Sequence, residues 1–278
     1  MSPAGAGRLV VCPTPIGNLD DITARVVEAL RGADVIACED TRTTGVLCDR
    51  HGIDTPRVRC DEHGERRAVP RLLERIVAGE TVALVSDAGT PVVSDPGFLL
   101  VRGAIEAGLP VEVLPGPSSV TTALVLSGLP ADSWRFCGFL PRRRGELEEA
   151  LGGGETLVAF ESPRRLPATL AALAAIDPER PVAVCREISK LHEETVRGTA
   201  AELASRYDGK PPKGEVVLVV GAASGPGADR REAVAAVRDL VEAGARPRQA
   251  ASVVARLTGL GANDLYGEAV TGDERSAT

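Results

Sequence analysis

The sequence has few aromatic residues and few histidines. Phe, Trp and Tyr make up 3% of its 278 residues, so the core must be built from Ala, Val, Leu and Ile. The three histidines, His51, His63 and His192, lie far apart and lack the spacing of metal ligands. We therefore expect no metal site.

Long apolar runs and a signal peptide are also missing. No apolar run reaches the length that spans a bilayer. The first residues, MSPAGAGRLVV, lack a charged segment followed by an apolar one. With 44% hydrophobic and 26% charged residues the composition is that of an ordinary globular protein, and we expect a cytoplasmic enzyme without membrane association.

Closely spaced cysteine pairs are missing too. The six cysteines form no C-x-x-C motif, and most lie in apolar runs such as VVC, VIAC and AVC. We expect reduced thiols in the core. The cysteines are Cys12, Cys38, Cys48, Cys60, Cys137 and Cys185.

Lysine is rare, and the net charge of −7 is acidic. This charge argues against a protein that coats nucleic acid, although PRRRGE (141–146) and ESPRRL (161–166) are local basic clusters. Of the 32 basic residues only Lys190, Lys210 and Lys213 are lysine. Because lysine can release a proton and arginine cannot, these three are candidates for proton transfer.

Strand and helix patterns alternate along the first half of the chain. This repeated βα order predicts an α/β fold with a mainly parallel sheet covered on both faces. An acidic residue is expected to cap the first helix. The predicted strands are 8–12, 34–40, 81–87 and 111–115, and the predicted helices are 20–33, a segment from Thr43, 64–79, 97–108 and 118–128.

The pattern changes after GLPADSW (128–134). We place a boundary near Pro115–Ser118, which gives α/β domains at 1–116 and 117–224. The second domain has predicted strands at 135–139, 156–161, 181–188, 192–198 and 214–220, with helices at 163–176 and 200–207.

A Gly/Ala/Ser/Pro linker, GAASGPGAD (221–229), precedes three helical segments, so 225–278 is predicted to be a linker and helical module. Two of these helices are joined by a tight turn, as in a helix-turn-helix. Residues 229–275 carry seven arginines and eight acids. A DNA-binding module is usually more basic, and we expect an accessory role.

Proline- and glycine-rich loops follow several predicted strands. They are PTPIGN (13–18), SDAGTPVVSDPG (86–97), LPGPSSVTT (114–122) and FESPRR (160–165). Proline fixes φ and glycine allows close backbone approach, and open α/β sheets bind ligands at this edge. The loops predict a preorganised pocket.

The expected ligand carries little phosphate. Neither G-x-G-x-x-G after the first strand nor G-x-x-x-x-G-K-[ST] occurs. Hydroxyls and backbone amides dominate the loops, together with Asp87 and Asp95 and without a cluster of cations. Such a pocket suits a ligand with ribose hydroxyls and an adenine.

Eight segments occur in the order seen in one family: PTPIGNLDDIT, EDTRTTG, SDAGTPVVSDPG, LPGPSS, GFLPRR, ESPRR, CREISKLHEE and KGEVVLVV. From about Arg8 to Tyr266 the chain resembles the bacterial 16S rRNA (cytidine-2′-O)-methyltransferases of the tetrapyrrole-methylase superfamily. The resemblance implies two αβα domains, S-adenosylmethionine in the cleft between them, a small C-terminal helical module and a homodimer.

The resemblance also implies which residues contact the cofactor. Pro15, Ile16 and Gly17 would form one wall, and the 86–97 and 114–122 loops would hold the ribose and methionine parts. The second domain would complete the site. The implied set is Pro15, Ile16, Gly17, Asp87, Gly89, Thr90, Val93, Ser118, Ser119, Phe139, Leu140, Glu161 and Cys185.

The substrate must be argued separately, because the superfamily includes precorrin and uroporphyrinogen C-methyltransferases. Those enzymes tend to carry G-x-G-P-G-D-P and GGDP, where this chain has PTPIGNLDDIT, with Asn18 in the acidic position, and AGTP. ESPRR and the C-terminal helices favour the RNA-modifying branch, and the resemblance implies a cytidine of 16S rRNA in the small ribosomal subunit, at the decoding centre. A tetrapyrrole C-methyltransferase and a DNA-binding regulator with a ligand-sensing α/β part are the alternatives.

Methylation of a ribose 2′-oxygen needs a base for its proton. Lys190 in CREISKLHEE is the candidate, since partial burial can lower a lysine pKa, and Glu187 either orients it or is itself the base. Contacts with RNA phosphates are expected from arginines near the loops. They are Arg42, Arg142, Arg143, Arg164 and Arg165. We expect the assembled small subunit, rather than naked rRNA, to be the substrate.

Overall fold

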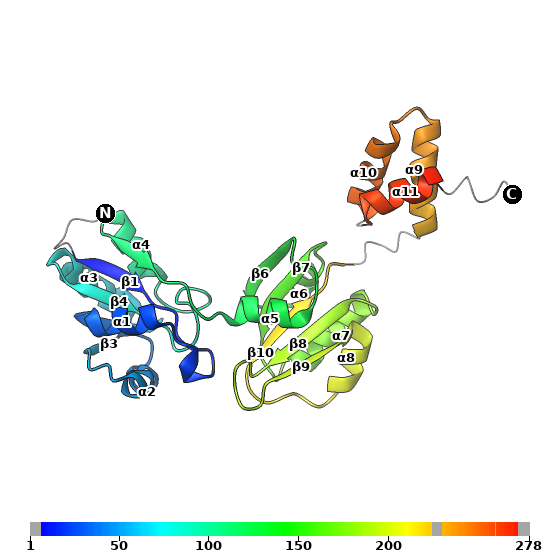
Figure 1. The fold of residues 1–278 in the computed structure, drawn as a ribbon. Helices are drawn as coiled ribbons and strands as arrows, with labels where there is room; N and C mark the ends of the chain where they lie inside the picture. Colours follow the sequence, from blue (N-terminus) through cyan, green and yellow to red (C-terminus); the bar gives the residue numbers. More distant parts are fainter. Residues whose placement is uncertain (1–6, 224–229, 259, 272–278) are drawn as a thin grey trace.

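The computed structural model describes residues 7–223, 230–258 and 260–271. Figure 1 shows two α/β parts, each built around one sheet, and a separate group of three helices towards the C-terminus. The predicted linker 221–229 lies outside the described residues from 224 to 229. The α/β class and the C-terminal helices predicted from the sequence are confirmed.

The first sheet has five parallel strands in the order β3-β2-β4-β1-β5. Its strands are β1 (Arg8–Val11), β2 (Val35–Cys38), β3 (Arg57–Arg59), β4 (Thr81–Leu84) and β5 (Val111–Val113). The edge strand β3 was not predicted, because RVR is too short and too polar to give a strand pattern. Strands β4, β1 and β5 are neighbours, so the three loops that follow them meet at one edge of the sheet.

Helices cover both faces of this sheet, as predicted. Alternate strand residues divide between two cores: Val10 and Ile36 face α1 and α2, whereas Leu9 and Val11 face α3 and α4. The helices are η1 (Leu19–Asp21), α1 (Ala24–Gly32), α2 (Thr41–His51), α3 (Glu65–Val77) and α4 (Phe98–Glu106).

The first helix begins later than predicted. Asp20 and Asp21 lie in the short 3₁₀ turn η1, and α1 begins only at Ala24. Its cap is Thr23, whose hydroxyl accepts a hydrogen bond from the backbone N–H of Val26 (3.2 Å). The prediction of an acidic cap for this helix is therefore wrong.

The second sheet has the order β6-β7-β10-β8-β9, and of its neighbouring pairs β6 and β7 are parallel and the other three antiparallel. Its strands are β6 (Trp134–Phe139), β7 (Thr156–Glu161), β8 (Pro181–Arg186), β9 (Glu194–Thr199) and β10 (Val216–Val220). The expectation of a mainly parallel sheet holds for the first half of the chain. The second sheet, for which the sequence predicted no strand direction, is mostly antiparallel, because a short turn joins β8 to β9 and β10 inserts antiparallel between β7 and β8.

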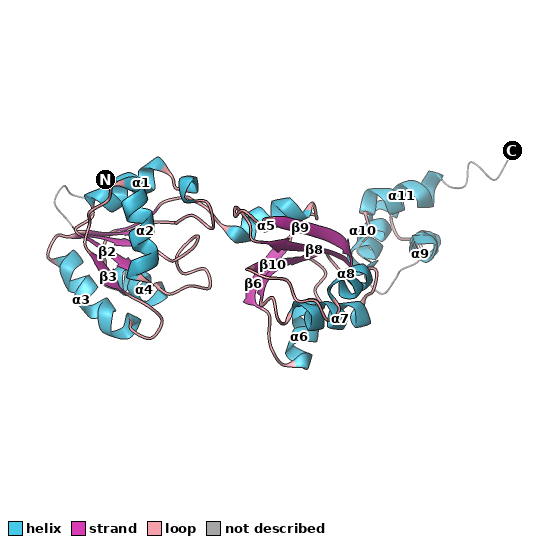
Figure 2. Cartoon of the chain, turned by 90° about the horizontal axis from the view of Figure 1, so that it is seen from below, coloured by secondary structure: helices cyan, strands magenta, loops and turns pink. Residues whose placement is uncertain are grey.

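Four helices pack against this second sheet. Helices α6 (Arg144–Leu151), α7 (Leu166–Ile176) and α8 (Ala200–Tyr207) lie on one face. Helix α5 (Ser119–Ser127) lies on the other, where Val120 and Ala123 pack against Val217 and Val219. Although α5 directly follows a strand of the first sheet, it belongs structurally to the second (Figure 2).

The C-terminal helices have a core of their own. Helices α9 (Arg230–Glu242), α10 (Pro247–Thr258) and α11 (Ala262–Thr271) bury Val237, Val254 and Leu265 against one another. Across the described residues, no helix combines the length and apolar character needed to cross a membrane.

Arg180 is fully buried where the chain leaves the second sheet. Its side chain is 1% exposed, its Nε donates to the carbonyl of Gly221 (2.7 Å) and its Nη2 donates to that of Gly153 (2.8 Å). The N–H of Ala223 also donates to the Gly153 carbonyl (3.1 Å). The guanidinium thus ties the segment after β10 to the loop before β7.

We expect Arg180→Met to reduce the free energy of unfolding by about 2–4 kcal/mol, because it leaves the buried Gly221 carbonyl without a donor and removes one of the two donors to the Gly153 carbonyl. Urea unfolding followed by circular dichroism measures this change. Arg144→Met, on the exposed surface of α6, is the control and should cost less than about 0.5 kcal/mol. Equal effects of the two substitutions would show that the buried guanidinium has no special role.

Candidate active site in the cleft between the two sheets

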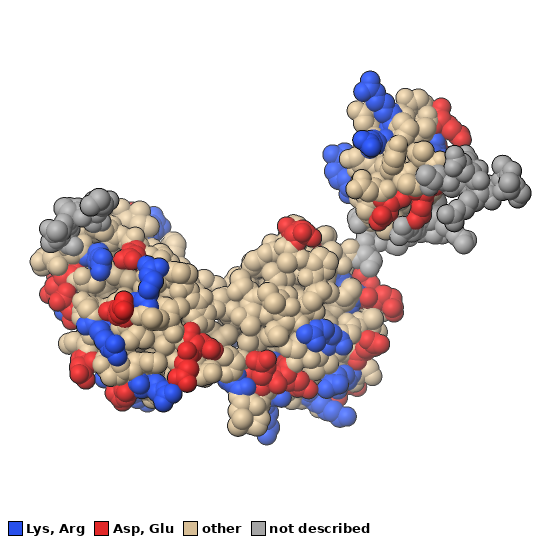
Figure 3. Space-filling view, viewed as in Figure 1, with Lys and Arg blue, Asp and Glu red and all other residues tan. Residues whose placement is uncertain are grey.

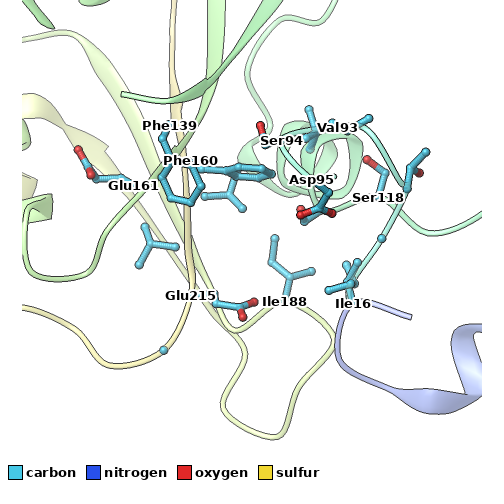
Figure 4. A pocket seen from close by; sticks show the side chains of 18 of the residues that line it. Ile16, Val93, Ser94, Asp95, Ser118, Phe139, Phe160, Glu161, Ile188 and Glu215 are labelled. Atoms are coloured by element: carbon cyan, nitrogen blue, oxygen red, sulfur yellow. The ribbon is translucent and has the colours of Figure 1, made fainter. Parts of the chain in front are cut away.

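A cavity of about 430 Å³ lies between the two α/β parts (Figure 4). Its volume falls within the usual range for a small-molecule site. One wall comes from loops of the first sheet, and the other from α5 and strands of the second. The lining residues are Ile16, Ala88, Gly89, Thr90, Val93, Ser94, Asp95, Ser118, Ser119, Val120, Phe139, Phe160, Glu161, Ser162, Pro163, Ile188, Gly214, Glu215, Val216 and Val217.

The loops after β1, β4 and β5 are bonded to one another. The Thr14 N–H donates to the Gly89 carbonyl (2.9 Å), and the Gly89 N–H donates to the Thr14 carbonyl (3.0 Å). The Thr90 hydroxyl donates to the carbonyl of Pro117 (3.2 Å), which ties in the third loop. The expected preorganised pocket is therefore built by hydrogen bonds as well as by prolines.

Backbone strain in the described residues is concentrated beside this cleft. All four non-glycine residues with positive φ lie in two cleft segments. Val92 (76°) and Ser94 (61°) are in the loop after β4, and Glu187 (50°) and Ser189 (66°) are in the turn after β8. Such conformations cost energy and cluster at functional sites, so they support this cavity as the working site.

Ser118 occupies the position before the first residue of α5, but its hydroxyl forms no capping bond. The Ser118 side chain lies in the cleft lining (Figure 4). The carbonyl of Ser118 instead accepts from the Thr122 hydroxyl (2.8 Å). Both serines predicted at this loop are in the lining.

The lining is apolar and acidic. Ile16, Phe160 and Ile188 give it hydrophobic surface, while Asp95 and Glu215 contribute carboxylates. Among the described residues that line the cavity there is no Lys or Arg. The chemistry therefore suits a ligand with a flat apolar group, hydroxyls and positive charge, and it disfavours a polyphosphate.

Asp95 and Glu215 line the cavity but were not among the predicted site residues, and of the two Asp95 has a shifted pKa. Its carboxylate points into the cavity (Figure 4), and burial, followed by the charge of Glu39, raises its pKa from 3.8 to about 6. The signal was present in the sequence, since Asp95 belongs to the SDAGTPVVSDPG loop. Nothing in the loop sequence, however, shows that this aspartate is buried.

Lys190 lies at the junction of the two parts rather than in the lining. Its Nζ donates to Glu187 Oε1 (3.1 Å) and to Glu215 Oε2 (3.0 Å). Burial lowers the Lys190 pKa, but the hydrogen bonds that its ammonium donates to the two carboxylates outweigh burial and raise it. The downward shift on which the base assignment relied is therefore reversed, although the pairing with Glu187 is present.

The turn after β8 explains that pairing. The Lys190 N–H donates to the Glu187 carbonyl (2.9 Å), so the chain is folded back here, and the two side chains share one side. The N–H of Glu215, followed by Lys190, lowers the Glu187 pKa. Glu187 is thus held as a carboxylate.

Gly17 is where the first loop touches this turn. A Cβ added to Gly17 would lie 2.5 Å from Lys190 Cγ and 2.9 Å from the Ile188 carbonyl oxygen. The glycine in PTPIGN therefore allows the two halves to meet. It contacts the second sheet rather than the cavity.

Eight of the thirteen predicted cofactor residues line the cavity, and five do not. The eight are Ile16, Gly89, Thr90, Val93, Ser118, Ser119, Phe139 and Glu161, and the five are Pro15, Gly17, Asp87, Leu140 and Cys185. Glu161 contributes little with its carboxylate, which points away from the cavity and accepts from the Thr169 hydroxyl (2.6 Å).

Three of those five side chains face other neighbours. Leu140 packs in the core on the far face of the second sheet, with α6 and α7. Cys185 is buried beneath α5. Asp87 accepts from the N–H of Asp40 (3.2 Å) and so holds the start of α2. These three side chains therefore are not part of the cavity lining.

The cysteines and metal-ligand candidates are easily placed. All six thiols are free, five are buried, and burial raises the pKa of Cys12 and of Cys60 to about 12. Within the described ranges, no group of three or more His, Cys, Asp or Glu residues is arranged to hold a metal ion.

The five predicted RNA-contacting arginines differ in their availability. Arg165 is turned inward and donates to the carbonyls of Leu140 (3.0 Å) and Pro141 (2.6 Å). Arg42 is paired with Asp40 (2.7 Å) and Arg143 with Glu146 (3.2 Å). The other two, Arg142 and Arg164, are exposed and form no salt bridge with any described residue.

Comparison with known proteins places this geometry in a family. The profile of the Tetrapyrrole (Corrin/Porphyrin) Methylases matches residues 8–204. The solved uroporphyrin-III C-methyltransferase of Thermus thermophilus, complexed with S-adenosylhomocysteine, shares the fold with a TM-score of 0.55 at 22% identity, over 77% of this chain and 97% of that one. The chain belongs to the tetrapyrrole methylase family.

Its relatives within the family are more specific. The chain is 46% identical over 257 residues to ribosomal RNA small subunit methyltransferase I of Mycobacterium bovis. This alignment covers 90% of each chain. It is 42% identical to the Thermotoga maritima protein of the same name, over 77% of this chain and 98% of that protein. The family resemblance predicted from the motifs is confirmed.

The buried carboxyl of Asp95 predicts a pH-dependent stability. Because its pKa is about 6 in the folded state and 3.8 ordinarily, the folded state binds the proton more tightly, and the free energy of unfolding falls as pH rises from 4 to 6. We expect Asp95→Asn to be about 1–2 kcal/mol more stable than the parent at pH 7.5. The two proteins should become equal near pH 4. Urea unfolding at both pH values measures this, with the exposed Asp132→Asn as control. Parallel curves for parent and Asp95→Asn would contradict the burial argument.

Proposed function

We propose that this protein transfers a methyl group from S-adenosylmethionine to the ribose 2′-oxygen of a cytidine at the decoding centre of 16S rRNA. The observation that carries the proposal is the 46% identity, over 90% of both chains, to a protein named ribosomal RNA small subunit methyltransferase I. The cytidine and its 2′-oxygen rest on the motif resemblance described above.

The cavity fits the cofactor. S-adenosylmethionine has an adenine, ribose hydroxyls, a positive sulfonium and no phosphate, and the lining offers apolar surface, serine hydroxyls, carboxylates and no cation. Thr90, Ser118 and the backbone of 214–217 would hold it, with Ile16 and Ile188 against its apolar parts. When bound, the cofactor supplies an electrophilic methyl group. Aligning the acceptor oxygen with that group is then the task of the rigid loops.

Two groups are candidates for accepting the proton of the 2′-hydroxyl. Lys190, oriented by Glu187, remains the prediction from the sequence, but at neutral pH its raised pKa keeps it protonated between two carboxylates. Asp95 points into the cavity and is ionised above about pH 6. Position and charge therefore favour Asp95 as the base and give Lys190 a structural role, in which it pairs with Glu187 and Glu215 beside Gly17 of the first loop.

The charge distribution supports RNA as a locally bound substrate. Figure 3 shows acidic and basic side chains interspersed over both α/β parts in this view, without a broad basic face. Contacts to phosphate would come from exposed arginines near the cleft, mainly Arg142 and Arg164. So small a contact area suits recognition of a single exposed nucleotide. Because the folded subunit presents such a nucleotide, we propose the assembled small subunit as the substrate.

The alternative of a tetrapyrrole C-methyltransferase is not favoured. Identity to the uroporphyrin-III enzyme is 22%, compared with 46% for the rRNA relative, and the loop motifs also differ from that branch. The DNA-regulator alternative is not favoured either, because the rRNA methyltransferase relative matches 90% of this chain. Cytoplasmic location and a homodimer, expected from the sequence and the resemblance, belong to the same proposal, and light scattering after gel filtration tests the dimer.

The first experiment follows methyl-labelled S-adenosylmethionine into purified small subunits that lack the modification. We expect label in 16S rRNA, recovered as 2′-O-methylcytidine after nuclease digestion. Deproteinised rRNA should accept much less label than subunits. Label in a porphyrinogen and none in RNA would place the protein in the other branch, and equal labelling of naked rRNA would refute the assembled substrate.

The identity of the base is decided by rate against pH. If Asp95 is the base, the single-turnover rate rises with pH through about 6 and is then flat, and Asp95→Asn lowers it by about 10²–10⁴-fold. If Lys190 is the base, the rise continues above pH 9, and Lys190→Ala causes the larger loss. Cofactor affinity, measured by calorimetry, shows whether either substitution merely disturbs binding.

A further inference from the structure

An exposed phenylalanine stands at the mouth of the cleft. Phe139, at the end of β6, lines the cavity and yet is 62% exposed. The chain has only four phenylalanines, and Phe139 is the most exposed of them. A large aromatic surface left open beside a ligand cavity is a feature that calls for a partner.

The position of this ring is fixed. The Phe139 and Phe160 rings meet edge to face with centroids 5.5 Å apart, and Phe160 meets Phe136 in the same way at 5.1 Å. Gly138 has a φ of 68°, and the pairing of β6 with β7 shifts register between Phe136 and Phe139. This bulge redirects the strand end, and the ladder of rings holds Phe139 in place.

The bulge also touches the opposite wall. A Cβ added to Gly138 would lie 3.1 Å from Ser94 Oγ, so the β6 bulge adjoins the loop that carries Asp95. Phe139 therefore stands at the rim where the two halves come together. Figure 4 shows its ring beside Phe160, on the wall across from Ser118.

The surroundings of Phe139 are cationic outside and acidic inside. Arg142 follows three residues later, and Arg164 is held close by the bonds from Arg165 to the carbonyls of Leu140 and Pro141. Neither Arg142 nor Arg164 has a salt-bridge partner among the described residues, whereas Arg143 and Arg144 do. Phosphates are thus attracted to the rim and repelled by Asp95 and Glu215 within.

We infer that Phe139 is the platform on which the base of the target nucleotide stacks, with Arg142 and Arg164 holding the flanking phosphates. This inference rests on the proposed function. It reassigns Phe139 from the cofactor, to which sequence reasoning gave it, to the RNA. Single-stranded RNA is commonly read by such stacking, which tolerates any base and fixes its plane.

A planar heterocycle on Phe139 has two sources, the target base and the adenine of the cofactor, so the experiment measures both. We expect Phe139→Ala to lower kcat/KM for small subunits by about 10–100-fold, while the Kd for S-adenosylhomocysteine changes less than twofold. Phe139→Trp and Phe139→Tyr should restore most of the activity. Phe98→Ala, at a residue 55% exposed and outside the cavity lining, is the matched control and should behave as the parent.

The arginines have their own matched pairs. Arg142→Gln with Arg164→Gln should raise KM and reduce the slope of log KM against log salt by about 2. Arg143→Gln with Arg144→Gln, whose side chains are already paired, should change that slope far less.

Several results would overturn the inference. A tenfold weaker Kd for S-adenosylhomocysteine in Phe139→Ala, with unchanged transfer at saturating cofactor, would return Phe139 to the cofactor site. Parent-like activity of Phe139→Ala would remove it from both. Failure of the parent protein to label RNA would refute the proposed function, and the platform with it. If the parent labels RNA but Phe139→Trp is as inactive as Phe139→Ala, the stacking role of Phe139 is refuted. The proposed function is not affected by that result.

Discussion

The paired hydrogen bonds between Thr14 and Gly89 are the constraint on which the site depends. They join the loops that follow β1 and β4, two neighbouring parallel strands, and hold both at a fixed distance from the sheet edge. Gly89 has a φ of 85°, a backbone conformation that favours glycine. Because this pair is fixed, Ile16 faces the cavity and Gly17 reaches the turn of the second sheet. The width of the cleft follows from that contact.

The same geometry separates charges by depth. Carboxylates of Asp95 and Glu215 face the cavity, while the unpaired arginines stand on the rim around β6 and α7. Screening limits the reach of surface charges to about 8–10 Å at physiological salt, so acids elsewhere on the molecule weigh little at this rim. A protein with a net charge of −7 is therefore compatible with local binding of RNA. An acidic interior also opposes entry of the phosphate backbone.

The sequence predicted the fold class and much of the cavity lining, because these depend on local patterns. Apolar runs ending in proline and glycine marked the β1, β4 and β5 loops, and Thr90 and Ser118 lie where those loops predicted. Antiparallel pairing of β10, and the position of α5 on the other sheet, depend on contacts distant in the chain and gave no local signal. The same holds for Leu140 and Lys190. For Leu140, strand alternation alone does not show which face of the sheet borders the cleft. For Lys190, two neighbouring carboxylates reverse the lowering of the pKa that partial burial predicts.

The division of labour between the parts follows from how they are joined. The first sheet contributes the three hydrogen-bonded loops. They present hydroxyls, backbone groups and the Asp95 carboxylate to the cavity, and none of their lining residues is an arginine. The second sheet contributes to the cavity lining as well, and it carries Phe139 and the exposed arginines around it, so the proposed cofactor site needs both halves whereas the proposed RNA contacts come mainly from the second. The C-terminal helices add a third part with its own core. The relative from Thermotoga maritima aligns over 98% of its length with only 77% of this chain. The Mycobacterium bovis relative aligns with 90% of this chain, so relatives of the same name differ in how much of it they match.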